Sequence, residues 1–199
     1  MDKRALATNR ARKPLFEKLG ELDEPNARQF VGMFPLTPSS IGNAVDLRNQ
    51  NAGQWADESQ QLPGYDQYDI QYPEYNQYDD PDYFFTETDY TSAKPEFTKG
   101  IKAIEKIIGS RCYRLRYSTL EPGAVLDWHM DQPTLDRFII VLSGKQRYEV
   151  MKRGEPHYIV QEPLDVWYIN ASWEHRVLNM QNEIRVALLG CFVYKYNKG

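Results

Sequence analysis

The sequence holds little of what secreted, membrane or nucleic-acid-binding proteins usually depend on. Its two cysteines, Cys112 and Cys191, lack the close spacing of a metal or redox motif, which favours a reducing compartment and structural roles. No stretch approaches the roughly 20 apolar residues that cross a bilayer, and no apolar run of a secretory signal follows the basic N-terminus. A sustained basic stripe is also missing. We therefore expect a soluble, cytoplasmic protein that binds neither membranes nor nucleic acid.

Basic residues are missing from one long segment. Residues 49–93 contain no Lys or Arg, whereas residues 57–89 carry ten Asp or Glu, and seven of the 14 tyrosines lie between Tyr65 and Tyr90. Two interpretations of this Tyr/Asp-rich segment, residues 57–90, stay open. It is an irregular surface segment whose tyrosines pack singly on the domain, or an acidic, aromatic arm that closes over a site or docks a cationic partner.

The length of 199 residues suits one domain. Within that domain the composition changes near residue 95. We expect residues 1–95 to form an N-terminal extension packed on the core, and residues 96–199 to form the core itself.

The second half shows helical and then strand periodicity. Three isoleucines lie on one face of a helix predicted over residues 98–108, and Gly109 follows as its C-cap. From residue 111 onward we expect about eight short strands with turns about every 8 to 12 residues, including a hairpin turn at Ser143–Gly144. This pattern predicts a mainly β fold with flanking helices, in the form of a double-stranded β-helix. Such a cupin-like jelly roll can hold a metal between its two sheets.

Histidine is scarce, and two of the three histidines form a pattern with a carboxylate. His129 and Asp131 make a His-x-Asp pair, and His175 follows 46 residues after the first histidine. Residues i and i+2 of a strand point to the same side, so the pair can face one ion. Two imidazoles and one carboxylate form the facial triad of non-haem Fe(II) oxygenases, although zinc also takes this ligand set. His157 follows a turn, and we expect it to be exposed.

Two arginines in apolar strands call for anionic partners. Arg185 lies ten residues after His175, and a buried arginine without an anion is costly. Its planar fork suits the distal carboxylate of a keto-acid cosubstrate; the alternative is a structural salt bridge. Arg137 begins the apolar run RFIIVL. It is a second candidate for binding an anion of cosubstrate or substrate, or else it forms an ion pair at the strand end.

Three runs of sequence resemble one enzyme family. They are RLRYSTLEPGAVLDWHMD, RFIIVLSG and VWYINASWEHRVLNMQNEIRVALL, which together cover about residues 110–195. Their order and spacing are similar to those of the aspartyl/asparaginyl β-hydroxylase-like family, which includes bacterial proline hydroxylases and belongs to the Fe(II)/2-oxoglutarate dioxygenases. Residues 1–95 show no such counterpart.

The resemblance implies roles for individual positions. The implied iron ligands are His129, Asp131 and His175. Arg185 would hold the far carboxylate of 2-oxoglutarate, and Ser118 matches a family serine whose hydroxyl shares that carboxylate; otherwise Ser118 is an ordinary strand residue. Arg137 matches a family arginine near the cosubstrate. Many relatives carry a histidine two residues after this arginine, and this chain has Ile139 there.

The resemblance also implies an activity. The protein would use Fe(II), 2-oxoglutarate and O₂ to hydroxylate an unactivated C–H bond of an amino acid, free or within a peptide or protein. Trp128 and Trp173 lie next to the histidines in sequence and are candidates for the substrate pocket, with core packing as the alternative. Two other classes stay open: a non-catalytic jelly-roll binding protein, and a cupin-type metalloenzyme that does not use 2-oxoglutarate. The sequence identifies neither the substrate nor the oligomeric state.

Overall fold

The structure is a computed structural model that describes residues 13–30, 65–66, 95–130 and 136–192. Asp131 lies outside these residues. So does the Tyr/Asp-rich segment except for Tyr65–Asp66. What the sequence predicts for Asp131 and for that segment therefore stays a prediction.

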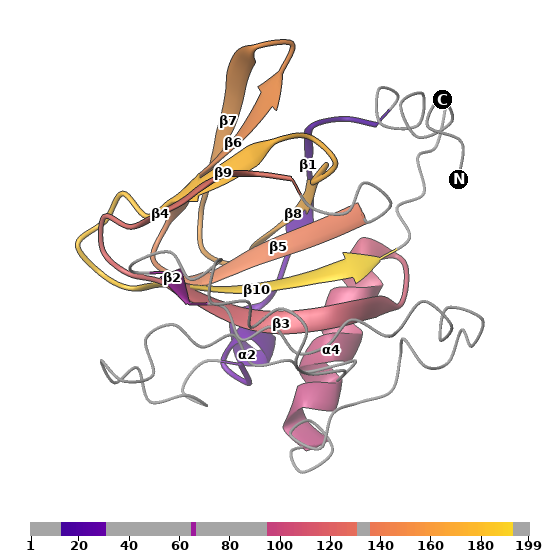
Figure 1. The fold of residues 1–199 in the computed structure, drawn as a ribbon. Helices are drawn as coiled ribbons and strands as arrows, with labels where there is room; N and C mark the ends of the chain where they lie inside the picture. Colours follow the sequence, from indigo (N-terminus) through magenta and orange to yellow (C-terminus); the bar gives the residue numbers. More distant parts are fainter. Residues whose placement is uncertain (1–12, 31–64, 67–94, 131–135, 193–199) are drawn as a thin grey trace, which may run out of the picture.

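Antiparallel strands in two facing sheets make up most of the described chain (Figure 1). The strands are β1 (Phe16–Glu21), β2 (Tyr65–Asp66), β3 (Cys112–Leu120), β4 (Val125–His129), β5 (Asp136–Ser143), β6 (Gln146–Lys152), β7 (Glu155–Gln161), β8 (Asp165–Ile169), β9 (His175–Leu178) and β10 (Arg185–Phe192). The helices are α2 (Glu24–Ala27) and α4 (Pro95–Ile108). The larger sheet has the order β1-β8-β5-β10-β3-β2, and the smaller sheet has the order β4-β9-β6-β7.

Strands β3 to β10 form the double-stranded β-helix. Four of them (β3, β5, β8 and β10) lie side by side in the larger sheet, and the other four make up the smaller sheet. Apart from the β6–β7 step, each connection carries the chain from one sheet to the other. Eight strands exchanged in this way between two sheets define a jelly roll. The predicted fold is confirmed by this strand order.

The predicted hairpin at Ser143–Gly144 is wrong. This turn joins β5 in the larger sheet to β6 in the smaller sheet, so the two strands do not pair. The hairpin is instead β6–β7, which closes at Arg153–Gly154, where both residues have positive φ (55° and 84°). Two successive residues at positive φ are the signature of a type I′ hairpin turn. A turn motif predicts that the chain reverses, but the packing of the two sheets decides which strand it joins.

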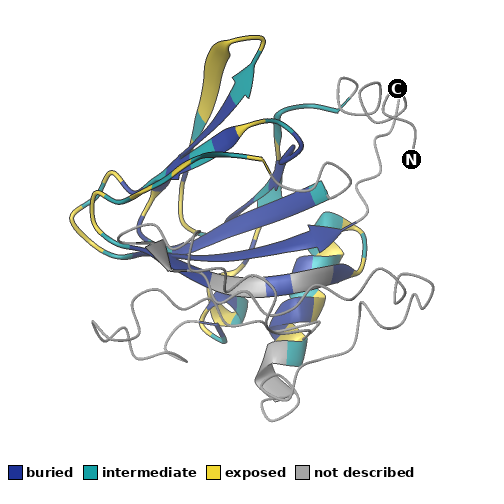
Figure 2. Ribbon diagram, in the orientation of Figure 1, coloured by how far each residue is buried: buried dark blue, intermediate teal, exposed yellow. Residues whose placement is uncertain are grey.

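Helix α4 packs on the outer side of the larger sheet (Figure 1). Ile101 and Ile104 are fully buried against it, and Ile108 is packed at its edge, as the isoleucine spacing predicts. Gly109 has φ 66° and ends the helix, while the Ser110 N–H donates to the Glu105 carbonyl at 3.3 Å. A left-handed glycine with this backward bond is a typical C-cap. Figure 2 shows the result, in which β5 and β10 are buried on both faces.

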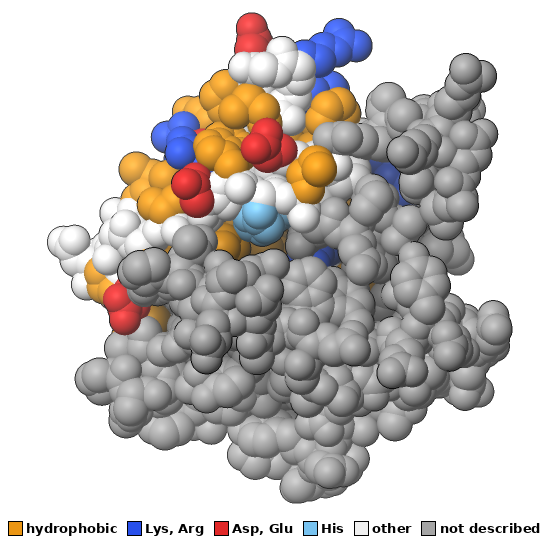
Figure 3. Space-filling model, viewed as in Figure 1, with side chains coloured by type: hydrophobic (Ala, Val, Ile, Leu, Met, Phe, Trp, Pro, Cys, Tyr) orange, Lys and Arg blue, Asp and Glu red, His pale blue; other side chains and the backbone are white. Residues whose placement is uncertain are grey.

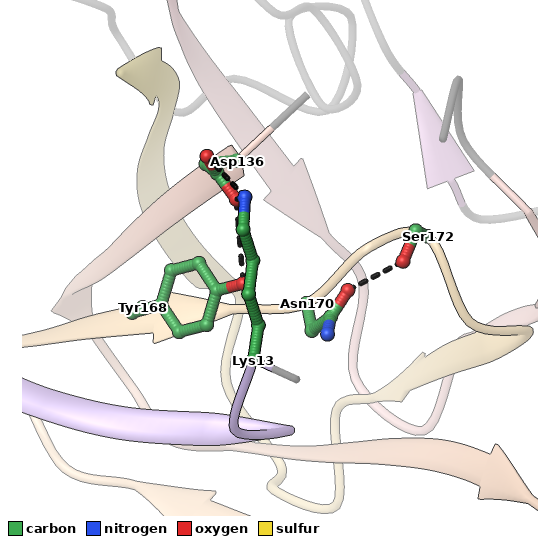
Figure 4. Close-up of polar contacts among 5 residues, drawn as sticks. All are labelled: Lys13, Asp136, Tyr168, Asn170 and Ser172. Atoms are coloured by element: carbon green, nitrogen blue, oxygen red, sulfur yellow. Dashed lines mark hydrogen bonds and ion pairs between the residues drawn. The ribbon is translucent and has the colours of Figure 1, made fainter. Parts of the chain in front are cut away.

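Residues 13–30 belong to the same fold as the β-rich half. Strand β1 pairs with β8 at the edge of the larger sheet, and Leu22 and Phe30 are fully buried in the core beneath it. Lys13 donates from Nζ to both carboxylate oxygens of Asp136 at 2.6 and 2.8 Å (Figure 4). The Tyr168 hydroxyl donates to the same carboxylate at 3.3 Å. These contacts tie the N-terminal segment to the first residue of β5.

Two smaller findings bear on the sequence predictions. Cys112 and Cys191 are buried thiols, in agreement with structural roles. Among the described residues, no helix combines the length and the apolar character that crossing a membrane requires.

Candidate metal and anion site

The space between the two sheets has two distinct ends, which the connections define. At one end β4 finishes at His129, β5 begins at Asp136, and residues 170–174 connect β8 to β9. At the other end, strands are connected by residues 121–124, 144–145 and 179–184. The first end holds His129 and His175 and is called the histidine end below. The second holds Arg185 and is called the arginine end. Between them lies an apolar layer whose buried members are Leu120, Ile139, Tyr148, Val150, Ile169, Val177 and Leu189.

The two histidines of the predicted triad lie side by side. His129 ends β4 and His175 begins β9, and the two residues are direct partners in the antiparallel pair. Their ring centroids lie 4.3 Å apart with an interplanar angle of 58°. Since metal–nitrogen bonds measure about 2.1 Å, two imidazoles at adjacent positions of one ion have centroids roughly 4 to 5 Å apart. The observed spacing fits that arrangement.

A β-bulge brings His129 onto the face of His175. Leu126 pairs with Val177 and His129 pairs with His175, so three residue steps along β4 lie opposite two along β9. In a regular strand Leu126 and His129 would point to opposite faces. The extra residue turns His129 to the side of Leu126, which packs against the apolar layer. Bulges often re-aim side chains in this way next to active sites.

Both imidazoles are held in the same tautomer. The Nδ1 atom of His129 lies 2.6 Å from the Asp127 carbonyl oxygen, and that of His175 lies 2.8 Å from the Trp173 carbonyl oxygen. A carbonyl can only accept, so each Nδ1 carries the proton and each Nε2 carries the lone pair. Metal-binding histidines almost always donate their second ring nitrogen to such a partner. The two residues are thus prepared as nitrogen donors.

The third predicted ligand, Asp131, is two residues beyond the end of β4 and outside the described residues. Among the residues that are described, no group of three His, Cys, Asp or Glu side chains could hold a metal. The donor set placed by the structure therefore consists of two imidazoles, which fits iron as well as zinc.

Arg185 and Ser118 meet at the arginine end, as the resemblance implies. Arg185 donates from Nη1 to the Ser118 hydroxyl at 2.8 Å and to the Ser118 carbonyl at 3.2 Å. The two residues are 3% and 1% exposed. Arg185 alternates along β10 with Val186, which packs on the helix side of the sheet, so its side chain lies on the inner face. A buried guanidinium is suited to an anion that enters this space.

Arg137 lies at the other end of the same inner face. It shares this face with Ile139 of the apolar layer, two residues along β5, and it is 8% exposed. Arg137 pairs with Cys191, six residues after Arg185 on β10. At about 3.3 Å per residue, roughly 20 Å separates the two arginine backbones. The two guanidinium groups therefore belong to opposite ends, and Arg137 lies near the histidines.

The two tryptophans occupy different faces of the smaller sheet. Trp173 packs against the inner apolar layer. Trp128 instead lies beneath the Arg176 guanidinium, 4.7 Å from the ring centre, and Arg176 alternates with the inward-facing His175. This contact puts Trp128 on the outer face, so the structure does not give it the predicted pocket position. On the same outer face Glu149 accepts from Arg176 at 2.7 Å and pairs with Arg147 at 2.6 Å.

His157 and Ile139 match what the sequence indicates. His157 is exposed on β7, away from the paired imidazoles. Ile139 is buried in the apolar layer, opposite Leu189 on one side and Trp167 on the other. The position at which many relatives carry a histidine therefore supplies no hydrogen bond here.

Asn179, to which the sequence pattern gave no role, organises the arginine end. Its Nδ2 lies 2.9 Å from the Leu120 carbonyl, 3.0 Å from that of Glu121 and 2.7 Å from that of Glu183. Its Oδ1 accepts from the Gln181 N–H at 3.1 Å. These contacts fix the 179–184 connection that leads into Arg185. The only sequence signal was an asparagine shortly before the arginine, which does not reveal such contacts.

No protein-family model and no curated protein sequence matches the chain. Among solved structures, the chain is similar over 38% of its length to Drosophila melanogaster CENP-C bound to CAL1, with 17% identity and a TM-score of 0.35, covering 58% of that chain. Bacillus subtilis oxalate decarboxylase gives 28% identity and a TM-score of 0.36 over 40% of this chain and 21% of the other. The cysteine peptidase Peruvianin-I from Thevetia peruviana latex gives 11% identity and a TM-score of 0.36, covering 39% and 48%. The match spans less than two thirds of each of these chains, and such scores carry no argument about function.

Proposed function

We propose that this protein is an Fe(II)/2-oxoglutarate-dependent dioxygenase that hydroxylates an unactivated C–H bond of an amino acid, free or within a peptide or protein. One observation carries the proposal. Two imidazoles with proton-bearing Nδ1 atoms lie paired at one end of the jelly roll, and a buried arginine–serine pair lies at the other end of the same inner space. Such a combination would suit a metal at the histidine end and the distal carboxylate of an acid at the arginine end.

The metal end would be formed by His129 and His175, with Asp131 as the predicted carboxylate ligand. The carbonyls of Asp127 and Trp173 hold the two imidazoles in the donor tautomer. Bound iron would supply the activation of O₂ that accompanies oxidative decarboxylation of the keto acid. Arg137 is buried on the inner face at this end and would contact an anionic group of cosubstrate or substrate.

The arginine end would bind the distal carboxylate. Arg185 holds the position through its bond to Ser118, and both side chains are withdrawn from water. Burial strengthens an arginine–carboxylate interaction, because solvent no longer screens it. The apolar layer between the ends, including Ile139 and Leu189, keeps water from the space that the carbon chain would occupy.

The test is anaerobic titration of the purified protein with Fe(II) and 2-oxoglutarate. We expect a weak charge-transfer band in the visible range that disappears in His129→Ala and is shifted or weakened in Arg185→Ala. A screen of amino acids and peptides for substrate-stimulated succinate release would then identify the substrate. Absence of both the band and 2-oxoglutarate binding in the wild type would refute the proposal. A metal-dependent activity without 2-oxoglutarate would instead favour a cupin-type enzyme, and ligand binding without turnover a non-catalytic protein.

A further inference from the structure

Two buried glutamines lie at the arginine end and have no part in the site described so far. Gln146 and Gln161 are direct partners in the β6–β7 pair and are 1% and 0% exposed. Both lie on the inner face of the smaller sheet, because each is two residues along its strand from Tyr148 or Ile159, which contact the apolar layer. Polar side chains this deeply buried normally complete their hydrogen bonds.

The two amides complete only one hydrogen bond between them. Gln146 Nε2 donates to Gln161 Oε1. Among the residues that the structure describes, Gln146 Oε1 and Gln161 Nε2 have no hydrogen-bond partner. If both amides were rotated, the bond would reverse, and one NH₂ group and one carbonyl oxygen would again be left over. The pair therefore offers one donor group and one acceptor atom to the interior in either of these orientations.

The pair lies next to the arginine. Gln146 follows Gly144 by two residues, and a Cβ atom on Gly144 would lie only 3.3 Å from the Arg185 Cα. Gly144 has φ 75° and turns the chain from β5 into β6 at this point. Arg147 pairs with Leu178 in the antiparallel β6–β9 pair. The preceding residue, Gln146, therefore lies level with Asn179 and the connection into Arg185. Gln146 therefore lies beside the connection that leads into Arg185, and Gln161 is its partner on β7.

We infer that Gln146 and Gln161 complete the carboxylate site at the arginine end. The spare amide N–H donates to the carboxylate held by Arg185. The spare carbonyl accepts from a water molecule whose other hydrogen is donated to that carboxylate. A neutral donor and acceptor beside a guanidinium suit a carboxylate with one bound water. The inference rests on the proposed function only in taking 2-oxoglutarate as the acid. The pair would thereby help to select acids that carry a second carboxylate.

The experiment compares the wild type with the double variant Gln146→Met/Gln161→Met. Methionine has nearly the shape of glutamine and carries no amide. Calorimetry would measure the Kd of 2-oxoglutarate with Fe(II) under anaerobic conditions, and the Kd of glutarate without metal. We expect both Kd values to rise roughly ten- to hundredfold, as for loss of a hydrogen bond to a charged group. Without acid, the variant should unfold at the wild-type temperature or above it, because both incompletely bonded amides are gone.

Two neighbouring exposed residues provide the controls. Lys145 and Glu162 pair at 2.7 Å beside the two glutamines, with side chains 45% and 52% exposed. Lys145→Met and Glu162→Gln should leave both Kd values unchanged. In the wild type, the side-chain amide NMR signals of Gln146 and Gln161 should shift when glutarate is added, a readout that does not depend on how the variants fold.

The outcomes separate the inference from the proposed function. Unchanged acid affinity in the double variant, or a wild type that binds neither acid, overturns the inference. Tight 2-oxoglutarate binding with the iron band, unaffected by the methionine changes, would leave the proposed function standing alone. Glutamine-dependent binding of glutarate without an iron band or turnover would leave only the inference standing.

Discussion

The histidine end and the arginine end of the inner space achieve polarity in different ways. At the histidine end, His129 is half-buried while His175 is 2% exposed. At the arginine end, Arg185, Ser118 and Asn179 are all 3% exposed or less. An end that is partly open can admit a metal, a gas and a substrate. A closed polar end can only hold a group that reaches it through the interior.

The two ends also differ in which contacts orient their polar side chains. The histidines are oriented by carbonyls two residues earlier on their own chain segments. Arg185 is oriented by contacts with residues far away in sequence, such as Ser118, 67 positions before it. Local contacts survive small shifts of the sheets, whereas long-range contacts require the finished fold. Substitutions at the two ends should therefore have separable effects.

The largest effect is expected for His175→Ala. Removal of one of the two imidazole donors should weaken Fe(II) binding by more than about a hundredfold, since even residues that only support a ligand matter ten- to hundredfold. Succinate formation should cease. Glutarate binding without metal, which depends on the arginine end, should persist. Metal titration followed by calorimetry would measure both, with the exposed His157→Ala as control. Wild-type metal affinity in His175→Ala would contradict the assignment.

Arg185→Gln should produce the complementary result. The affinity for 2-oxoglutarate should fall roughly ten- to hundredfold, because a charge-assisted hydrogen bond is lost. The Fe(II) affinity should change little, since the imidazoles lie at the other end. Arg28→Gln is the matched control, because Arg28 is exposed just after the short helix α2, where it pairs with Glu24. Equal losses of metal and acid binding would mean that the two ends are not independent.

Asn179→Ala should disturb the arginine end through its backbone. Three carbonyls would lose their donor, which we expect to lower the free energy of unfolding by about 2–4 kcal/mol. Binding of 2-oxoglutarate should weaken more than binding of Fe(II). Asn179→Asp, which can still accept from the Gln181 N–H but cannot donate to the carbonyls, should behave similarly.

Glu149→Gln would show whether the effect of Asn179 is specific to the arginine end. It weakens two ion pairs on the outer face and should lower stability by about 3 kcal/mol. Because neither end is touched, the ratio of metal to acid affinity should stay at the wild-type value. An equal change in the ratio of metal to acid affinity in Asn179→Ala and Glu149→Gln would mean that Asn179 only stabilises the fold in general.

The smallest effect concerns Lys18, which belongs to neither end. A hydrogen bond to Asp165 raises the pKa of Lys18 above its ordinary value of 10.5. A raised pKa means that the contribution to stability is complete below pH 10.5 and is lost as the pH rises through the higher value of the folded state. Lys18→Met should lack this part of the pH dependence in unfolding experiments. The effect is small because the side chain is 46% exposed.

Much of the fold followed from local pattern. The isoleucine spacing and Gly109 predicted helix α4, and alternation with regular turns predicted the eight strands of the jelly roll. The pairing of strands could not be predicted from local pattern. The turn at Ser143–Gly144 indicated a reversal correctly, but the chain crosses to the other sheet there. The contribution of β1 to the larger sheet was also missed, because an edge strand 144 or more residues before its partner β8 carries no signal of that pairing.

The candidate site likewise combines residues that the sequence predicted with residues that it did not. Residue type and spacing were enough to select His129, His175 and Arg185, and the family resemblance added Ser118. The structure arranges these four residues in two pairs. Trp128 was placed beside a histidine by sequence and lies on the outer face, because the bulge in β4 changes the alternation. Asn179 and the glutamine pair escaped notice, because burial and backbone contacts are not encoded in a short motif.

By itself, the sequence determined the chemistry available to this protein and the periodicity of its elements, because these depend on side-chain type and on neighbours along the chain. Tertiary structure alone decided which groups meet. The bulge that aligns the two imidazoles, the 67-residue separation bridged by Arg185 and Ser118, and the burial of the polar end all arise only when two sheets close over a common interior. Closure removes water from those groups, and their interactions gain strength from that removal.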